Sequence, residues 1–210
     1  MKKYSVIISG KAGLKGIGYI LQYLSSKKKI RKLMEYLESV KTLRESIEQK
    51  QLNVMDKPGT YRWWFKEDAA NKLVSNIPIS QCQTRVIDGE TYVALYFGMS
   101  INLKKRFKWH ICQKHTKSAV KSGFLSTLRQ TISALMSCPM TRSEDCINKL
   151  MDDNCYLEWS YTGSKKDAEE LESKELSQPQ FAYPFNNAKN KTVAKGHLKY
   201  LTELRREYKK

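Results

Sequence analysis

The chain has 210 residues, 40% of them hydrophobic, which is enough to bury the core of one domain. No apolar run approaches the roughly 20 residues that a membrane-spanning helix needs, and the apolar stretch over residues 4–9 is too short for a signal peptide. The five cysteines are odd in number and irregularly spaced, which is typical of a reducing compartment. We therefore predict a cytoplasmic protein without a membrane partner.

The net charge of +17 predicts a polyanionic partner, with nucleic acid the first candidate. The charge is unevenly placed: residues 91–143 contain no Asp or Glu, whereas residues 144–175 contain ten acidic residues against four lysines. A basic stretch followed by a carboxylate-rich one suits an enzyme that holds phosphate with one part and a metal with the other. Two solvated faces of opposite sign would give the same pattern, so charge alone leaves both interpretations open.

The first part of the chain predicts an amphipathic helical arm over residues 1–57. Apolar residues recur at three- and four-residue spacing over residues 17–51, among lysines and glutamates. Pro58 and Gly59 end this pattern. Residues 61–65 are rich in aromatic side chains and predict a strand, and residues 68–75 predict a short helix.

The second part predicts alternating strands and helices. Residues 82–87 and 91–97 read as strands joined by a hairpin at Asp88-Gly89-Glu90. Asn102 predicts the cap of a helix to about residue 115, and Ser126 or Ser122 the cap of a helix over residues 125–136. A strand over residues 156–161 and helices over residues 167–176 and 197–208 complete the prediction.

These elements predict an α+β fold with a small, mainly antiparallel central sheet flanked by helices. We expect three parts: the helical arm 1–57, a central domain 58–190 and a basic C-terminal helix within 191–210. The arm would wrap DNA or supply the interface of a homodimer, or else pack against its own domain.

Five kinds of side chain between residues 59 and 187 could carry chemistry. Tyrosines stand in Gly59-Thr60-Tyr61 and Tyr96-Phe97-Gly98, and Arg106 and His110 lie four apart on one helix face. A later helix carries Glu172, and Asn186 and Asn187 follow in a loop. The paired carboxylates of a two-metal nuclease are lacking. The set does supply what a one-metal phosphodiesterase needs: a base for water, a cation for the developing charge and one hard oxygen ligand for magnesium.

These motifs, in this order, resemble the GIY-YIG nuclease superfamily over about residues 58–190. The Arg-x-x-x-His spacing and the long segments between motifs look most like its restriction-endonuclease branch. Thr60 and Phe97 replace the family's isoleucines with other β-formers, and Met99 stands where many members have lysine.

The resemblance implies a Mg²⁺-dependent endonuclease, with Mn²⁺ able to substitute, that hydrolyses phosphodiester bonds of double-stranded DNA at specific sites. Tyr61 would act as general base or hold the attacking water, with a neighbouring cation favouring its phenolate. Tyr96 would bind the phosphate or order that water. Arg106 would stabilise the charge on the phosphate, and His110 would hydrogen-bond to a tyrosine or a phosphate oxygen. Glu172, or alternatively Glu175, would hold the metal. Asn186 or Asn187 would pin the loop or contact the phosphate.

A wider set of basic and hydroxyl side chains is predicted to bind DNA. The set comprises Lys104, Lys105, Lys108, Lys114, Lys117, Lys121, Ser126 and Arg129. In this set Ser126 and Arg129 stand at a predicted helix start, where phosphate is readily held. Among the aromatics, Trp63 and Trp64 alternate on one strand, which predicts that only one of them is buried.

Other interpretations stay open at this stage. A structure-specific or homing-type nuclease would use the same chemistry, and a non-catalytic nucleic-acid-binding module would use the tyrosines only for packing. A restriction enzyme must cut two strands, so a two-fold homodimer on a palindromic site is the natural expectation. Cys112 and His115 invite a zinc site that the scattered remaining cysteines do not complete. The sequence Gly16-Ile17-Gly18-Tyr19-Ile20 resembles the first family motif but opens a predicted helix.

Overall fold

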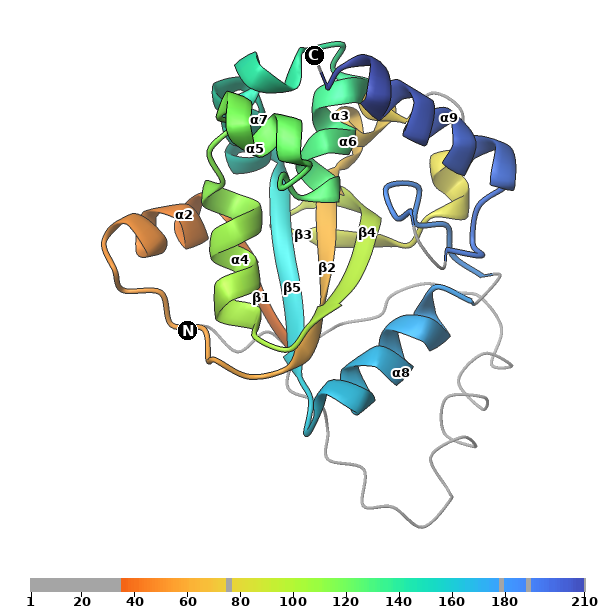
Figure 1. Ribbon diagram of the computed structural model, residues 1–210. Coiled ribbons are helices and arrows are strands. Elements are labelled where there is room, and N and C mark those ends of the chain that lie inside the picture. Colours follow the sequence, from red (N-terminus) through yellow and green to blue (C-terminus); the bar gives the residue numbers. More distant parts are fainter. Residues whose placement is uncertain (1–34, 75–76, 178–179, 188–189, 210) are drawn as a thin grey trace. The chain divides into compact units, whose positions relative to one another are not determined.

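The computed structural model describes residues 35–74, 77–177, 180–187 and 190–209 (Figure 1). Its centre is one sheet of five strands, β1 (Glu35–Ser39), β2 (Gly59–Lys66), β3 (Thr84–Ile87), β4 (Glu90–Ser100) and β5 (Cys155–Tyr161). The strand order is β1-β5-β2-β4-β3, and every neighbouring pair is antiparallel. Helices pack on this sheet, so the predicted α+β class with a small antiparallel sheet is confirmed.

The described helices agree with the sequence pattern at most of the predicted places. They are α2 (Val40–Glu48), α3 (Glu67–Leu73), α4 (Leu103–Cys112), α5 (Lys117–Ser122), α6 (Thr127–Leu135), α7 (Glu144–Asn154), α8 (Lys165–Glu175) and α9 (Lys195–Glu207), with 3₁₀ turns η1 (Ile79–Gln81) and η2 (Met140–Arg142). The predicted caps are present, since Asn102 accepts from the amide of Lys105 and Ser126 from that of Arg129. Helices α5 and α7 were not predicted. None of the described helices combines the length and apolarity that crossing a bilayer requires.

The helix predicted over residues 17–51 is wrong at residues 35–39, which form the edge strand β1. Tyr36 stacks on Trp159 of β5 with ring centroids 5.3 Å apart, and β1 pairs with β5 along its whole length. This tertiary pairing overrides the local helical periodicity. Residues from Met34 onward form one compact unit, so residues 35–57 fold with the sheet. The rest of the predicted arm, including Gly16–Ile20, lies outside the described residues.

The two faces of β2 are both covered, and we name them by their side chains. The tyrosine face carries Tyr61, Trp63 and Phe65 and packs in one apolar core with residues of α2, α4, α6 and α7. The arginine face carries Arg62 and Trp64 and packs with Phe97, Tyr183 and the end of α8. Trp63 and Trp64 are therefore both fully buried, on opposite faces, and the prediction that only one would be buried is wrong.

The β3–β4 hairpin forms as predicted at Asp88 and Gly89. Both residues have positive φ angles, 50° and 82°, as a type I′ turn requires. The turn fixes the register of β4, the strand that carries the second tyrosine motif.

Candidate active site

A bulge in β4 places the second tyrosine beside the first. Trp63 pairs with Tyr96 and Trp64 with Ala94, so Leu95 has no partner on β2. The extra residue turns Tyr96 onto the tyrosine face. There the rings of Tyr61 and Tyr96 lie 6.1 Å apart, centroid to centroid.

The glycines of the two motifs are required by close approach. Gly98 pairs with Tyr61 across the strands, and a Cβ at Gly98 would lie 2.8 Å from the Tyr61 hydroxyl oxygen. A Cβ at Gly59 would lie 2.2 Å from the carbonyl oxygen of Ser160 and 2.7 Å from Leu103 Cδ1. The absence of a side chain at Gly98 lets the Tyr61 ring lie flat over β4. The absence of a side chain at Gly59 lets β2, β5 and α4 meet at one point.

Helix α4 brings a histidine and an arginine to the tyrosine pair. His110 is buried, and its Nε2 lies 2.8 Å from the hydroxyl oxygen of Tyr61. Arg106, one turn earlier, is partly exposed and stacks on Trp109 with its guanidinium carbon 4.8 Å from the ring centroid. Arg129 donates to the carbonyl oxygen of His110 at 3.0 Å, which fixes the end of the helix.

The electrostatics of this cluster keep Tyr61 and His110 neutral. Burial, followed by the neighbouring Tyr96, raises the pKa of Tyr61 well above 10, although the positive charge of Arg106 acts in the opposite direction. Burial likewise raises the pKa of Tyr96. Burial and the charges of Arg106 and Arg129 lower the pKa of His110 well below 6.5. The expected phenolate at Tyr61 is therefore not the resting state, because desolvation outweighs the nearby cation.

Helix α8 places Glu172 at the edge of the same strand pair. One carboxylate oxygen of Glu172 accepts a hydrogen bond from the amide of Met99 on β4 at 3.0 Å. Its negative charge raises the pKa of both Tyr61 and Tyr96, although less than burial does. Glu175, the alternative metal ligand, instead forms an ion pair with Arg62 at 3.0 Å and bonds to the Tyr183 hydroxyl. The two glutamates thus differ in their contacts: Glu172 bonds to the backbone of β4, whereas Glu175 bonds to Arg62 and Tyr183.

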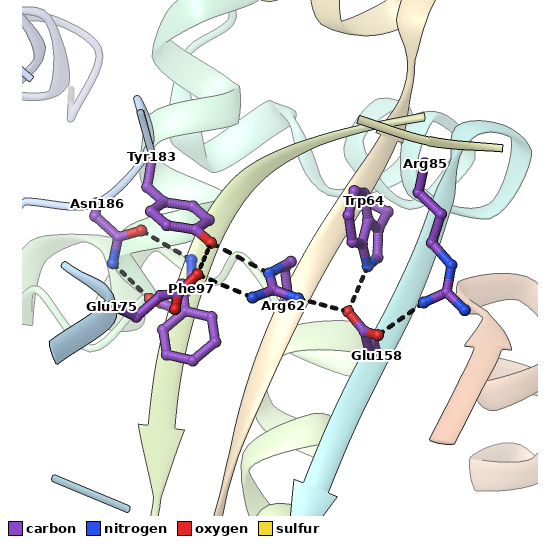
Figure 2. Close-up of polar contacts among 8 residues, drawn as sticks. All are labelled: Arg62, Trp64, Arg85, Phe97, Glu158, Glu175, Tyr183 and Asn186. Atoms are coloured by element: carbon purple, nitrogen blue, oxygen red, sulfur yellow. Dashed lines mark hydrogen bonds and ion pairs between the residues drawn. The ribbon is translucent and has the colours of Figure 1, made fainter. Parts of the chain in front are cut away.

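Asn186 acts on the second tyrosine motif through the backbone (Figure 2). Its side chain is buried, accepts from the amide of Phe97 at 2.8 Å and donates to the carbonyl oxygen of the same residue at 2.5 Å. Both groups lie on the edge of β4 that β3 leaves unpaired, so the amide takes the place of a neighbouring strand. Asn187 is partly exposed and follows this contact.

The predicted DNA-binding residues divide into exposed and buried ones. The exposed or partly exposed lysines lie on α4, after it, or on α5: Lys104, Lys105, Lys108, Lys114, Lys117 and Lys121. Lys114 forms an ion pair with Glu144 at 2.8 Å. Ser126 and Arg129 are fully buried, with Arg129 bonded to Asn148 and His115 at 2.7 Å each. The prediction that Ser126 and Arg129 contact DNA is incompatible with their burial. In the sequence alone, Arg129 had no evident carboxylate partner and therefore resembled a surface cation.

The metal-ligand candidates of the described residues are few. No group of three His, Cys, Asp or Glu side chains in these ranges is arranged to hold a metal ion. His115 bonds to Ser143 and to the carbonyl oxygen of Met140, so it forms no zinc site with Cys112. A single carboxylate at Glu172 does fit Mg²⁺, which keeps several waters and takes substrate phosphate oxygens as further ligands.

Sequence reasoning missed a polar network on the arginine face, centred on Arg62 and Glu158 (Figure 2). Arg62 bonds to Glu158 at 2.9 Å and to Glu175 at 3.0 Å, and Arg85 bonds to Glu158 at 2.7 Å. The available signal was an acidic residue in the middle of the apolar strand Leu157-Glu158-Trp159. A buried carboxylate at such a place requires a cation or another hydrogen-bond donor.

The comparison with protein families agrees with this geometry. The model of the GIY-YIG catalytic domain matches residues 59–207, from the first glycine of β2 to the end of α9. No curated protein and no solved structure matches the chain. The family match covers more than half of the chain and includes both tyrosine motifs, α4 and α8, and on this basis the chain belongs to the GIY-YIG nuclease superfamily.

Proposed function

We propose that this nuclease is a Mg²⁺-dependent endonuclease that hydrolyses phosphodiester bonds of double-stranded DNA at specific sites. The observation that carries the proposal is the buried contact of 2.8 Å between Tyr61 and neutral His110, with Tyr96, Arg106 and Glu172 around it. Nδ1 of His110 is buried without a hydrogen-bond partner in the described part of the chain, which is costly for packing alone.

In this proposal Tyr61 and His110 form a proton relay. The attacking water gives its proton to the Tyr61 hydroxyl while the Tyr61 proton moves to Nε2 of His110. No resting phenolate is then needed, which agrees with the raised pKa of Tyr61. Tyr96 orders the water or the phosphate, and Arg106 stabilises the charge that develops on the phosphate oxygens.

Glu172 is the proposed ligand of the metal. A bound Mg²⁺, for which Mn²⁺ can substitute, would supply positive charge to the scissile phosphate and its leaving oxygen. The amide of Met99 holds one carboxylate oxygen of Glu172, which orients the carboxylate toward the tyrosine pair. Glu175 is a weaker candidate because Arg62 and Tyr183 already engage it.

The DNA duplex would lie along the lysines of α4 and reach the C-terminal helix. Lys117 and Lys121 of α5, Arg206 of α9 and Lys209 line an open hollow of about 520 Å³. In the described part of the chain none of these four cations forms an ion pair with a carboxylate. Such a cluster suits the phosphate backbone rather than the base edges, so it would position the duplex without reading its sequence.

Two further parts of the proposal rest on the sequence. A homodimer would allow both strands of a palindromic site to be cut, with the part of the predicted arm that precedes β1 as the interface or as a DNA-wrapping segment. The five free cysteines support a reducing, cytoplasmic location.

The test is cleavage of supercoiled plasmid and long linear DNA with Mg²⁺, with Mn²⁺ or with EDTA. We expect metal-dependent cutting that falls at least about 100-fold in Tyr61→Phe and in Glu172→Gln. Tyr200→Phe and Glu170→Gln are the matched controls, because both residues are exposed and Glu170 lies on the same helix as Glu172.

The fragment pattern distinguishes the remaining functions. Discrete bands from linear DNA support a site-specific enzyme, whereas cutting confined to branched or nicked substrates supports a structure-specific or homing-type nuclease. Binding without nicking on all of these substrates would favour the non-catalytic module. Undiminished cutting by Glu172→Gln together with loss in Glu175→Gln would move the metal to Glu175.

A further inference from the structure

Helix α8 carries the proposed metal ligand but has little apolar surface with which to hold itself on the sheet. Ala168 is its one buried residue among those described, and most of its side chains are charged. Glu172 and Glu175 lie one turn apart, and both reach the sheet with a carboxylate. Apart from Leu176 at its C-cap, which packs with Trp64 and Tyr183, α8 is therefore positioned largely by polar contacts.

The strongest of these contacts is made by Arg62, the residue after Tyr61 on β2. Its Nη2 donates to Glu175 at 3.0 Å, its Nη1 to Glu158 of β5 at 2.9 Å and its Nε to the Tyr183 hydroxyl at 3.3 Å. The guanidinium also lies over the Phe97 ring, 5.2 Å from the centroid. Figure 2 shows Arg62 between Glu158 on one side and Glu175 and Tyr183 on the other.

Glu158 keeps Arg62 in this position. One oxygen of Glu158 accepts from Arg62 and from the indole of Trp64, and the other accepts from Arg85 at 2.7 Å. A carboxylate held by three donors, two from β2 and one from β3, is a rigid anchor, so the guanidinium it binds has one orientation. The free side of that guanidinium faces α8.

We propose that Arg62 is the positioning residue of the metal site: by pairing with Glu175 it fixes α8 so that Glu172 meets the amide of Met99 beside Tyr61 and Tyr96. This inference rests on the proposed function of Glu172 as metal ligand. Arg62 itself lies on the opposite face of the strand from Tyr61 and takes no part in the chemistry.

The test compares Arg62→Gln with Arg85→Gln. Both substitutions remove one positive charge and one bond to Glu158, but only Arg62 contacts α8. Loss of a cation near a Mg²⁺ site would by itself strengthen metal binding. Weaker binding in Arg62→Gln alone therefore reports position rather than charge.

The first readout needs neither metal nor DNA. Hydrogen exchange of the Met99 amide is slow while Glu172 accepts its hydrogen bond. We expect this exchange to become at least about tenfold faster in Arg62→Gln and to stay unchanged in Arg85→Gln, at a temperature where both variants are folded by circular dichroism. Equal Met99 protection in the two variants would overturn the inference.

The second readout is the metal requirement. We expect the Mg²⁺ concentration for half-maximal cleavage, and the dissociation constant of Mn²⁺ in a calorimetric titration, to rise about 10-fold or more in Arg62→Gln. The KM for DNA should not change, since Arg62 does not face the substrate. A merely structural loss would lower the active fraction and leave the metal midpoint in place.

Arg62→Lys keeps the charge and serves if the glutamine variant does not fold. One ammonium cannot reach Glu158, Glu175 and Tyr183 together, so we expect partial loss of Met99 protection. Full protection in Arg62→Lys would overturn the inference. If the wild-type protein cuts no DNA, the proposed function fails. The exchange of the Met99 amide still tests whether Arg62 fixes the position of α8 on the sheet.

Discussion

The two faces of β2 hold their helices by different physics. On the tyrosine face, Phe107 packs edge-on against Tyr61 and Trp159, and the helices above it bury leucines and isoleucines. On the arginine face, α8 is held by Arg62 and by the backbone amide of Met99 on β4. Strand β2 thus separates an apolar core from a charged network, and its side chains belong alternately to one and to the other.

This contrast shows how one domain can hold a neutral tyrosine–histidine pair and a charged carboxylate, the proposed metal ligand Glu172, beside the same two strands. Burial on the tyrosine face holds Tyr61 and His110 uncharged. The polar face delivers a carboxylate to the end of the same strands without burying it in that core. The largest stability loss is therefore expected on the tyrosine face, and effects on metal binding are expected on the arginine face.

The largest expected effect is on the apolar face. Phe107→Ala removes a fully buried ring and should lower the free energy of unfolding by about 3–5 kcal/mol. Urea denaturation followed by tryptophan fluorescence measures it. Lys108→Ala, on the exposed side of the same helix, is the control and should stay within about 0.5 kcal/mol. A loss below about 1 kcal/mol for Phe107→Ala would contradict a close-packed tyrosine face.

Next comes the anchor of the polar face. Glu158→Gln leaves two partly buried arginines without their shared carboxylate and should cost about 2–3 kcal/mol of unfolding free energy. Glu90→Gln breaks a more exposed ion pair with Lys66 and should cost much less. Equal losses in the two variants, measured by the same denaturation, would show that the network adds nothing beyond surface pairing.

The side chain of Asn186 stabilises the unpaired edge of the second tyrosine motif, Tyr96-Phe97-Gly98. Asn186→Ala leaves the buried amide and carbonyl groups of Phe97 without their partner and should cost about 2 kcal/mol. Amide exchange at Phe97 should accelerate in parallel. Asn187→Ala, one residue later and partly exposed, should change neither quantity. The reverse result would make Asn187 the residue that pins the loop.

The smallest effect concerns pH and separates the neutral cluster from the charged network. The pKa of His110 is lowered on folding, so the unfolded chain binds more protons below about pH 6.5 and stability is lost as pH falls. His115 acts in the same direction. Between pH 7 and pH 6, we expect His110→Gln to lose less unfolding free energy than the wild type. Parallel pH profiles would show that folding leaves the pKa of His110 unchanged.

Local signals in the sequence sufficed where neighbours in the chain decide the structure. The hairpin at Asp88-Gly89, the caps at Asn102 and Ser126 and the strands carrying Tyr61 and Tyr96 depend on residues within a few positions, and all form as predicted. The order of the motifs was also sufficient to identify the family. The net charge predicted a polyanionic partner but did not predict which basic side chains are exposed.

What only the tertiary structure decided depends on pairs far apart in the sequence. Residues 35–39 have a helical pattern but form a strand because β5, more than a hundred residues later, offers an edge to pair with. Arg129 resembles a surface cation but is buried, and its guanidinium donates hydrogen bonds to His115 and Asn148. The choice between Glu172 and Glu175 likewise follows from Met99 and Arg62, since two carboxylates one turn apart on a helix are equivalent until a sheet is placed beside them.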